Sequence, residues 1–507
     1  MAADVIVVGA GPTGLMLAGE LAQMGVRTLL LERRREPSEV AKAGGLAGHI
    51  LQLLHYRGEL DRFREASTSL GSEAILRFPF GGLHLDFTRL EHPPMRVMLL
   101  PQPRLEAVLA ERAMEYGAGI RRGHEVVGLH GDDETVTVDV HSPDGPYQVA
   151  ARYVVGCDGG RSRVRELAGI TFAGDSLPEV ERLASVTVPD SVTVREDGGL
   201  DVAGVGTIPF GYTATQHGVF ACSGAAGAMG IYTAEEEATS YDDVPMTVAE
   251  LAASVRRVLG VDLPLGEPIR MTRFGYSAKQ ADTYRRGRVF LAGDAAHLFP
   301  AGGVAVNAGM LDAVNLAWKL AASIHGWAPP ALLDTYSDER HAAAERTLLH
   351  TRAQLALRRG YGPNADALRA LFLELSGDEQ PLRRLGALMA GTDLGLPSSE
   401  AQPLVGSFVT DAVMRVDHDD PRLAGMLRPE RAVLLDLADR SDLREYAERW
   451  GARVDVANVT IAEPPADALL IRPDGLIAWA APSEAHSETA FSTLRQALST
   501  WLGELPA

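Results

Sequence analysis

Three short stretches of the chain place glycines directly after an apolar run. An acidic residue accompanies each of them, either within the stretch or at the end of the next apolar run. The stretches are 9–14 (GAGPTG), 156–160 (GCDGG) and 293–297 (GDAAH), and the acidic residues are Glu32, Asp158 and Asp294. A glycine after a strand lets the backbone approach a ligand closely. A carboxylate there can accept hydrogen bonds from sugar hydroxyl groups. The pattern therefore indicates a ligand that carries phosphates and hydroxyls, although each aspartate on its own is also a typical helix N-cap.

The first stretch has a separate role for each of its glycines. Gly9 allows a tight turn, Gly11 lets the backbone approach a pyrophosphate, and Gly14 lets helix and strand pack closely. The helix that follows offers unpaired N–H groups and a partial positive charge to phosphates. Glu32 ends the next strand, at the distance expected for a ribose 2′-hydroxyl contact. The sequence therefore predicts a dinucleotide site at residues 4–33, and a structural glycine turn is the alternative.

The elements that must position these groups follow from the hydrophobic pattern. The runs 4–8, 28–31, 153–155 and 288–292 are apolar throughout, which is typical of parallel strands buried on both faces. The sequence predicts helices at 48–57 and 60–67, and a third helix that follows residues 99–104 and ends near residue 117. It also predicts a hairpin within 73–100 that turns at Gly81-Gly82, and strands 126–129 and 136–140 that pair across a turn at 132–133.

The rest of the chain divides into two further parts. Residues 172–277 alternate strand-like runs with glycine turns around one helix at 248–259, which predicts a mostly antiparallel sheet. A long helix is expected at 310–324, and helical patterns continue to about residue 389. Strands at 431–437, 453–456 and 468–472, with helices between and after them, predict a small α/β domain.

Composition narrows the possible functions of the chain. Its 507 residues are enough for two to four domains, and a net charge of −19 argues against nucleic acid and anionic membranes as partners. Cys157 and Cys222 form neither a CxxC pair nor a metal-ligand cluster, so no disulfide framework or metal site is expected. No apolar run of eighteen residues occurs, and residue 4 already begins a strand, which predicts a cytoplasmic protein. Both a monomer and a homodimer fit these data.

Together, the three stretches resemble the fingerprints of the group A flavoprotein monooxygenases, the p-hydroxybenzoate hydroxylase-like enzymes. The helix 312–320 (DAVNLAWKL) is similar to the one that follows their third fingerprint. The C-terminal part resembles the thioredoxin-like tail of the branch that acts on aromatic polyketides, phenols and rifamycins. It has no cysteine and so cannot carry out a dithiol reaction. The resemblance implies an α/β fold with a Rossmann-like FAD-binding domain (1–171 and 278–390, with the hairpin joining the middle part), an inserted antiparallel substrate domain (172–277) and a thioredoxin-like domain (400–507).

The resemblance also implies which residues surround bound FAD. Asp158 is expected to serve both FAD and the reduced nicotinamide cofactor, and Asp294 to hold the ribityl chain. Arg33 is expected beside the adenosine, with an exposed turn as an equal alternative, and Arg104 is a weaker candidate than Gln102. The full set of expected cofactor contacts is Gly9, Gly11, Pro12, Thr13, Gly14, Glu32, Arg33, Lys42, Gln102, Arg104, Val126 or Val127, Asp158, Asp294, Pro300, Gly303, Val306 and Asn307.

The chain departs from the family pattern at three places. Lys42 stands where the family usually has an arginine, which keeps the charge but loses the bidentate fork. His49 stands where the polyketide branch often has another arginine. The loop 300–307 (PAGGVAVN) is one residue shorter than the family pattern, and it keeps Asn307, so Val306 and Asn307 are expected to supply the backbone donors toward the flavin.

The resemblance implies hydroxylation of an aromatic substrate through a C4a-hydroperoxyflavin, with transient NADPH or NADH and with O₂. No side chain is assigned a catalytic role, and a structural role for His297 is favoured over proton transfer. Few cations lie on the predicted middle strands, which favours a large neutral polyketide-like substrate. The expected lining of its pocket is His49, Phe78, Phe80, Phe210, Tyr212, Phe220 and Phe274, with ordinary core as the alternative for each phenylalanine and for Tyr212.

Two other activities fit the same residues. The flavin would equally support Baeyer–Villiger oxygenation or epoxidation. The altered loop after Asp294 also permits a flavin-binding protein without oxygenase activity, which would act as an isomerase, a cyclase or a scaffold.

Overall fold

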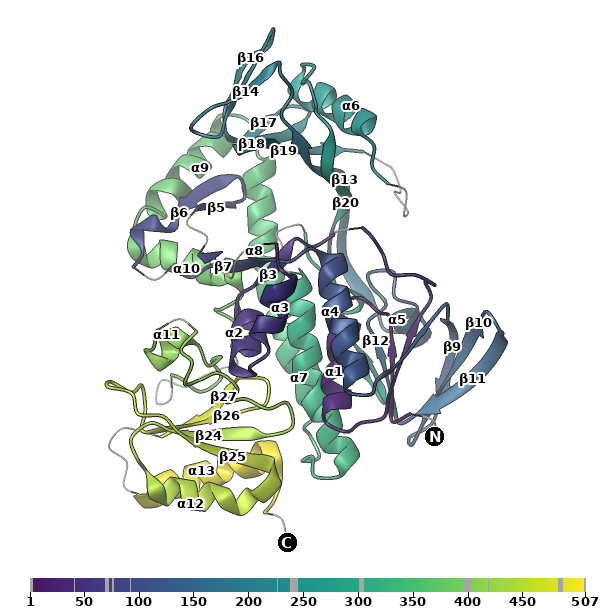
Figure 1. Cartoon of the computed structure of the whole chain (residues 1–507), viewed down its shortest axis with the longest axis vertical. Coiled ribbons are helices and arrows are strands. Elements are labelled where there is room, and N and C mark those ends of the chain that lie inside the picture. Colours follow the sequence, from purple (N-terminus) through teal and green to yellow (C-terminus); the bar gives the residue numbers. More distant parts are fainter. Residues whose placement is uncertain are drawn as a thin grey trace.

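The computed structural model describes residues 3–40, 42–68, 73–74, 77–91, 93–225, 227–237, 245–300, 305–395, 403–417, 419–481 and 487–505. Three parts follow one another along the long axis of the molecule (Figure 1). A sheet-rich part lies at the top, an α/β part at the centre, and the C-terminal part at the lower left. Among the described helices, none has the length and apolarity needed to cross a membrane.

The central part is built on a six-stranded sheet. Its strand order is β21 (Arg285–Arg286), β22 (Val289–Leu291), β12 (Tyr153–Gly156), β1 (Val5–Val8), β2 (Thr28–Glu32) and β8 (Gly119–Arg122). All neighbours are parallel except β21, and β1, β12 and β22 are buried throughout. The predicted buried parallel strands are therefore confirmed. Because the carboxyl ends of parallel strands share one edge, the three glycine stretches lie at that edge.

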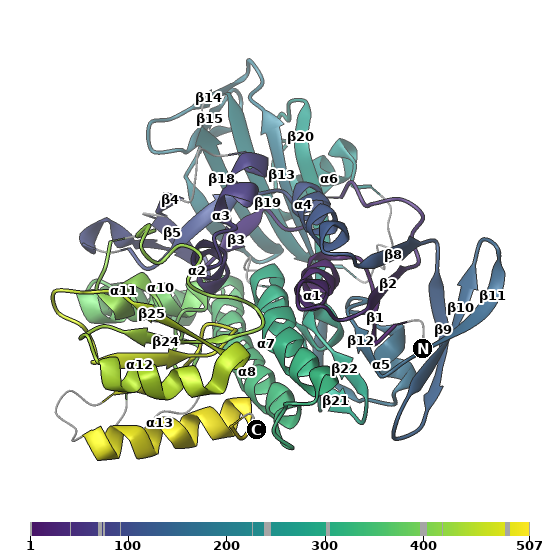
Figure 2. The same ribbon diagram turned by 60° about the horizontal axis from the view of Figure 1, so that its bottom comes forward.

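Helices α1 (Pro12–Gln23) and α7 (Ala305–His325) pack against each other beside this sheet, and α4 (Gln102–Glu115) packs on α1 (Figure 2). The expected start of α7 at residue 310 is wrong, because the helix already includes Gly309. A Cβ atom at Gly309 would lie 2.4 Å from Thr13 Oγ1. This glycine therefore allows close helix packing and does not mark a loop.

Three small sheets surround the central part. Strands β9 (Glu125–Gly131), β10 (Val136–Ser142) and β11 (Gly145–Ala151) form an antiparallel meander, of which β11 was not expected. The hairpin β5 (Arg77–Phe80) and β6 (Leu83–Asp86) turns at Gly81-Gly82 as predicted. The flanking strands form a separate sheet, in which β7 (Arg96–Leu99) lies between β3 (Gly45–Ala47) and β4 (Glu73–Ala74) and pairs with both. Helices α2 (His49–Tyr56) and α3 (Leu60–Ala66) follow β3 in the chain.

The sheet at the top of Figure 1 is antiparallel, as predicted, and reaches down to the central part. Its order is β17 (Gly211–Thr215), β18 (Gly218–Ala225), β19 (Ala228–Glu236), β13 (Phe172–Thr187), β20 (Pro268–Ala281) and β23 (His297–Leu298). Helix α6 (Val248–Leu259) has the predicted bounds and covers one face with an apolar core. The short strand β23 directly follows the third glycine stretch, so this sheet is hydrogen-bonded to that site.

Three helices connect the central part with the top sheet. Helix α8 (Asp334–Arg359) spans roughly 39 Å at 1.5 Å per residue. It is followed by α9 (Pro363–Leu375) and α10 (Glu379–Ala390). Side chains from the hairpin β5–β6 and from α8 and α10, with Phe372 of α9 against them, form a separate apolar cluster. The division of the chain into domains at residues 171, 278 and 390 stays a prediction.

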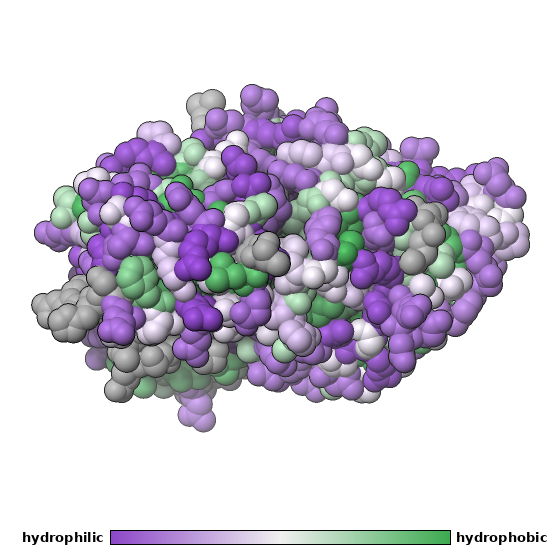
Figure 3. Space-filling view, turned by 90° about the horizontal axis from the view of Figure 1, so that it is seen from below, coloured by the Kyte–Doolittle hydropathy of each residue, from purple (hydrophilic) through white to green (hydrophobic). Residues whose placement is uncertain are grey.

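The C-terminal part has the topology of a thioredoxin-like unit. Its strand order is β25 (Val454–Asn458), β24 (Ala432–Asp436), β26 (Ala468–Ile471) and β27 (Ile477–Ala480), of which only β24 and β25 are parallel. Helices α12 (Ser441–Ala447) and α13 (Ser487–Leu502) follow the first and last strands. Seen from below, this end of the molecule shows hydrophobic residues in separated patches among polar ones (Figure 3).

The stability of the top sheet should depend strongly on one buried arginine. Arg182 lies on β13 with its side chain 1% exposed, and it pairs with Glu235, Glu237 and Glu250. We expect Arg182→Met to lower the free energy of unfolding by about 3–5 kcal/mol, because it removes the buried positive charge that three carboxylates share and leaves only Arg257 beside Glu235 and Arg273 beside Glu250. Guanidinium titration followed by circular dichroism measures the change.

The matched control is Arg195→Met, which removes an ion pair with Asp197 on the protein surface. Water screens exposed charges, so we expect nearly unchanged stability. Equal losses in the two variants would contradict a special role of the buried cluster.

Candidate functional site

The first and second glycine stretches touch through their backbones. Gly9 has a φ of +107°, and a Cβ atom there would lie 2.4 Å from the carbonyl oxygen of Cys157. A Cβ atom at Gly14 would lie 2.0 Å from the carbonyl oxygen of Gly9. Real side chains never approach so closely, so the crossing of these segments requires glycine at both positions.

The third stretch packs against the first through Thr13. Gly293 has a φ of +62°, and a Cβ atom there would lie 2.6 Å from Thr13 Oγ1. Gly309 of α7 approaches the same hydroxyl from the other side. The structure therefore brings together all three stretches that the sequence singled out.

Gly11 differs from these glycines because no described residue occupies the space beside it. A Cβ atom at Gly11 would meet no heavy atom within 4 Å. Gly11 is also the N-cap of α1, which begins with Pro12 and has no side-chain cap and no acidic residue in its first turn. Open space before an uncapped helix N-terminus fits a pyrophosphate, which would accept hydrogen bonds from these N–H groups.

Glu32 is fixed beside this helix end. Its Oε2 accepts a hydrogen bond from Ala10 N at 2.8 Å, and its Oε1 accepts one from Arg34 N at 2.8 Å. Each carboxylate oxygen keeps a second lone pair, which fits a ribose hydroxyl. Arg33 is exposed next to it. The predicted contacts of Glu32 and Arg33 with the cofactor are compatible with this geometry and stay predictions.

Val127 lies at an irregularity of strand β9. Asp139 of β10 pairs with Gly128 and Val140 pairs with Val126, so Val127 is skipped in the ladder. A bulged residue leaves its backbone groups outside the strand pairing. Its carbonyl oxygen accepts a hydrogen bond of 3.4 Å from Arg163. This arrangement fits the expected backbone contact with adenine better at Val127 than at Val126.

Asp158 has a structural role in the second stretch. Its Oδ1 accepts a hydrogen bond from Ser162 Oγ at 2.5 Å, and its Oδ2 accepts bonds from the N–H groups of Arg163 and Val164. These contacts satisfy the first N–H groups of helix α5 (Arg163–Leu167), but the N-cap residue of this helix is Ser162, so the alternative that Asp158 is itself an N-cap is wrong. Burial raises the pKa of Asp158, and its hydrogen bonds oppose that shift.

Asp294, the acidic residue of the third stretch, is also available to a ligand. It lies in the turn Gly293–Ala295, is exposed, and has no hydrogen-bond or ion-pair partner within the described part of the chain. Protein surrounds it on its other sides, so that desolvation raises the pKa of its carboxyl, while His297 and Lys42 act in the opposite direction. An accessible carboxylate at this point fits the ribityl hydroxyls of FAD, the cofactor that the resemblance implies.

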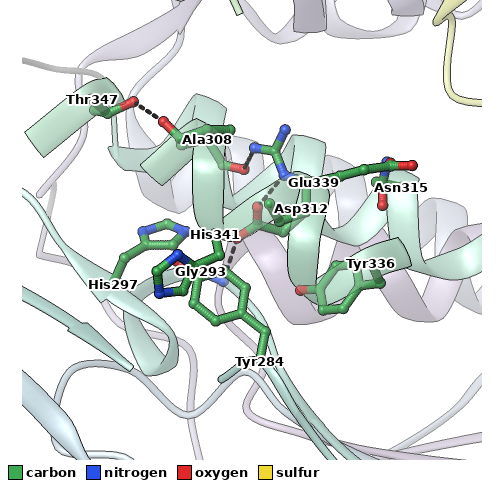
Figure 4. A network of polar contacts seen from close by, with 12 residues as sticks. Tyr284, Gly293, His297, Ala308, Asp312, Asn315, Tyr336, Glu339, His341 and Thr347 are labelled. Carbon is green, nitrogen blue, oxygen red and sulfur yellow. Dashed lines mark hydrogen bonds and ion pairs between the residues drawn. The ribbon is translucent and has the colours of Figure 1, made fainter. Parts of the chain in front are cut away.

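The backbone of this turn is held by a buried cluster that the sequence did not predict (Figure 4). Asp312 Oδ2 accepts hydrogen bonds from Gly293 N at 2.9 Å and from His297 Nε2 at 2.7 Å. Its Oδ1 accepts one from Arg340 Nε at 2.6 Å. Burial alone would raise the pKa of Asp312, but the charges of Arg340 and His297 outweigh it and hold the pKa below its usual range. The signal in the sequence was an aspartate within an otherwise apolar stretch of helix.

Two amides fix the segment between β2 and α2. Gln102 Oε1 accepts a hydrogen bond from Ala43 N at 3.1 Å, and Asn307 Oδ1 accepts one from Ala47 N at 2.9 Å. Lys42, next to Ala43, is exposed. Arg104 is exposed too, and it donates a 3.5 Å hydrogen bond to the carbonyl of Ala66. Pro300 is buried, Val306 is half-buried, and Gly303 lies outside the described residues.

The expected lining of the substrate pocket is only partly compatible with the structure. Tyr212 and Phe274 lie on the face of the top sheet that is turned away from α6. Tyr212 also lines a cavity of about 470 Å³ between β17, the hairpin turn at Gly81-Gly82 and the end of α8. Phe78 is half-buried beside that hairpin, and Phe210 is exposed and stacks on His84.

Three of these expectations are corrected. Phe220 is fully buried on the opposite face, under α6, because it neighbours Val219 and Ala221 on an alternating strand. Phe80 is buried in the hairpin cluster and stacks on Phe372. His49 is buried and stacks on Phe408 of the C-terminal part at 4.2 Å. Its pKa is lowered to about 3 by burial, so it carries no charge toward a substrate.

Gly11 and Gly14 predict two different defects. Gly11→Ala adds a methyl group to open space at a residue with a φ of −78°, so the fold should be unchanged. We expect its Kd for FAD to rise by about tenfold or more, because the methyl group occupies the space of the pyrophosphate. Fluorescence quenching of FAD titrated into apoprotein measures this. An unaltered FAD affinity of Gly11→Ala would contradict the assignment.

Gly14→Ala should instead lower the thermal unfolding midpoint of the apoprotein, because its methyl group would overlap the carbonyl oxygen of Gly9.

Comparisons with known proteins agree with this geometry. Residues 2–351 match the family described as FAD binding domain, and residues 402–504 match the family described as aromatic-ring hydroxylase, C-terminal. The 12-dehydrotetracycline 5-monooxygenase/anhydrotetracycline 6-monooxygenase of Streptomyces rimosus is 38% identical over 99% of both chains. A rifampicin monooxygenase of Streptomyces venezuelae is 39% identical and matches 94% of this chain and 95% of its own.

A solved structure extends the likeness to the whole fold. The OxyS anhydrotetracycline hydroxylase from Streptomyces rimosus superposes on 100% of both chains with a TM-score of 0.83 at 35% identity. The resemblance seen in the three glycine stretches and in the C-terminal part is thereby confirmed. The chain belongs to the family of FAD-dependent aromatic-ring monooxygenases.

Proposed function

We propose that this chain hydroxylates a large, neutral, polyketide-like aromatic compound, with NADPH or NADH as reductant and O₂ as oxidant. The observation that carries this proposal is the sheet face opposite α6. This face begins near the turn that carries Asp294, and the side chains of Leu183, Tyr212, Ala221 and Tyr232 lie on it. Leu183 is 38% exposed there, which is unusual for a leucine in the middle of a sheet.

Three charged groups near this face, Arg358, Glu179 and Glu181, neutralise one another within the protein. The guanidinium of Arg358 donates to both Glu179 and Glu181, and Glu181 also accepts a hydrogen bond from Tyr232 at 2.8 Å. Arg182 and Arg273 lie on the other face and pair with Glu250. An arginine that is already paired is a poor site for a substrate carboxylate, which favours a neutral substrate over a benzoate.

Bound FAD would supply the redox chemistry, namely oxidation of the nicotinamide and activation of O₂. The chain would bind the pyrophosphate at Gly11 and the N-terminus of α1, the ribose at Glu32 and the ribityl chain at Asp294. The Asp312 cluster orients the backbone beneath Asp294. His297 is fully buried and bonded to Asp312, which supports a structural role for it and not one in proton transfer.

The proposed reaction can be tested with anhydrotetracycline, a substrate named for one relative, and with a panel of polyphenolic polyketides. We expect NADPH or NADH oxidation to increase when a substrate is present, and the product to gain one atom of ¹⁸O from ¹⁸O₂ at an aromatic carbon. Product structure distinguishes hydroxylation from Baeyer–Villiger oxygenation or epoxidation. A product formed without ¹⁸O by FAD-loaded protein would show non-oxygenating chemistry and contradict the proposal.

Asp294 predicts how FAD affinity depends on pH. Only the ionised carboxylate is a strong acceptor for ribityl hydroxyls, and desolvation raises the pKa of this group above its ordinary value. Affinity for FAD should therefore be full above that raised pKa and fall as the pH drops through it, at a higher pH than for an ordinary carboxylate. Titration of apoprotein with FAD from pH 4 to 8 measures this. Asp294→Asn should bind FAD more weakly and without that pH dependence, and an identical pH profile would refute the assignment.

A further inference from the structure

We propose that the C-terminal thioredoxin-like domain holds the flavin-binding turn at Gly293 in place, and that Arg472 and Asp474 are positioning residues for that site. The proposal concerns binding of FAD and is independent of the substrate and of the reaction.

A tight turn of the C-terminal domain inserts into the central part of the protein. It connects β26 with β27 at residues 472–475, and Gly475, with a φ of +83°, lies against the ring of Phe408. The carbonyl of Pro473 accepts a hydrogen bond from Arg57 of the α2 C-terminus at 3.1 Å. The two charged side chains of the turn, Arg472 and Asp474, are 1% and 4% exposed and point to α7 and α8.

These side chains complete a buried cluster of four charges. Arg472 forms two parallel hydrogen bonds of 2.8 Å with Glu339 of α8, and Lys319 of α7 donates to the same carboxylate at 2.8 Å. Asn315 donates to both Glu339 and Asp474 at 2.7 Å. Two positive and two negative charges balance, so removal of Arg472 leaves an uncompensated carboxylate inside the protein.

The same two helices hold the flavin-binding turn one helical turn away. On α7, Asn315 contacts the C-terminal domain, and Asp312, three residues earlier, accepts the N–H of Gly293. On α8, Glu339 contacts Arg472, and the next residue, Arg340, donates to Asp312. Figure 4 shows Asn315 and Glu339 near Asp312, whose own dashed contacts hold the turn at Gly293. Because protein interiors are close-packed, a shift of Glu339 or Asn315 displaces Asp312 and Arg340 as well.

A small cavity lies between the two sets of contacts and adds a second, independent observation. It has a volume of about 40 Å³ and is lined by residues of both parts, among them His49, Asn315, Arg340 and Asp474. The Nε2 atom of His49 and the Oδ1 atom of Asn315 are buried there without a hydrogen-bond partner in the described part of the chain. The rest of its lining includes the apolar residues Leu311, Phe408 and Leu476, so both parts contribute polar and apolar groups to this cavity. The C-terminal domain and the flavin-binding helices therefore meet directly at this point.

The test compares variants of the full-length protein by their Kd for FAD and by the visible circular dichroism of bound flavin. We expect Arg472→Met to raise the Kd by about tenfold and to change the flavin dichroism, as is typical when a residue that supports a binding group is lost. Arg472→Lys keeps the charge and should recover most of the affinity. The matched control is Arg64→Met on α3, which breaks another ion pair with the C-terminal part, at Asp419. Among the described residues, the ion pairs of Arg64 involve neither α7 nor α8. This variant should leave both readouts unchanged.

Several outcomes would overturn the proposal. A Kd for FAD that is the same in Arg472→Met and in the parent protein contradicts it, and so does an equal loss in Arg64→Met, which would show general loosening of the interface. If Arg472→Met does not fold, Asp474→Asn keeps the shape of the turn and should still weaken FAD binding, so that an unaltered Kd counts against the proposal. In the double variant with Asp312→Asn, the effect of Arg472→Met on binding should be smaller than it is alone, and full additivity would exclude a route through Asp312.

Discussion

The fold depends on one constraint, the crossing of three backbone segments at the carboxyl edge of the central sheet. Gly9 passes over the carbonyl of Cys157, Gly14 over the carbonyl of Gly9, and Gly293 and Gly309 close on Thr13. No other residue type permits these approaches, because a side chain would overlap main-chain or Thr13 atoms. Segments from three distant parts of the sequence therefore fix one another. They leave open space beside Gly11, at the N-terminus of α1, among the residues that the structure describes.

Much of this arrangement could be predicted, because its signals are local. Buried parallel strands consist of apolar residues only, and glycines follow them where helix and strand cross. The pattern of helix α6 gave its bounds without error, since a capping threonine precedes it and a glycine ends it. The expected start of α7 at residue 310 lies just after Gly309, a residue type that usually interrupts helices, whereas here its missing side chain makes room for Thr13 within the helix.

Other features depend on contacts that no local pattern reveals. Asp158 has both carboxylate oxygens occupied by the start of α5, a role that its spacing permits but does not distinguish from ligand binding. The face on which Phe220 lies depends on the strand register, and a shift of one residue would reverse it. The partner of His49 is Phe408, more than three hundred residues away. Asp312 and Arg340 were missed for the same reason, because their importance lies in what they hold in place.

The strands β13 and β20 have a mechanical consequence. They run from the substrate face at the top to β23, where Lys279 pairs with Leu298, four residues after Asp294. Their pairing shifts register between Ser176 and Val180, below the substrate face. A register shift of this kind bends a strand and increases its local twist. The top sheet is therefore joined to the cofactor turn by paired strands that can bend at one defined place, so a movement of the sheet above that place need not displace Asp294.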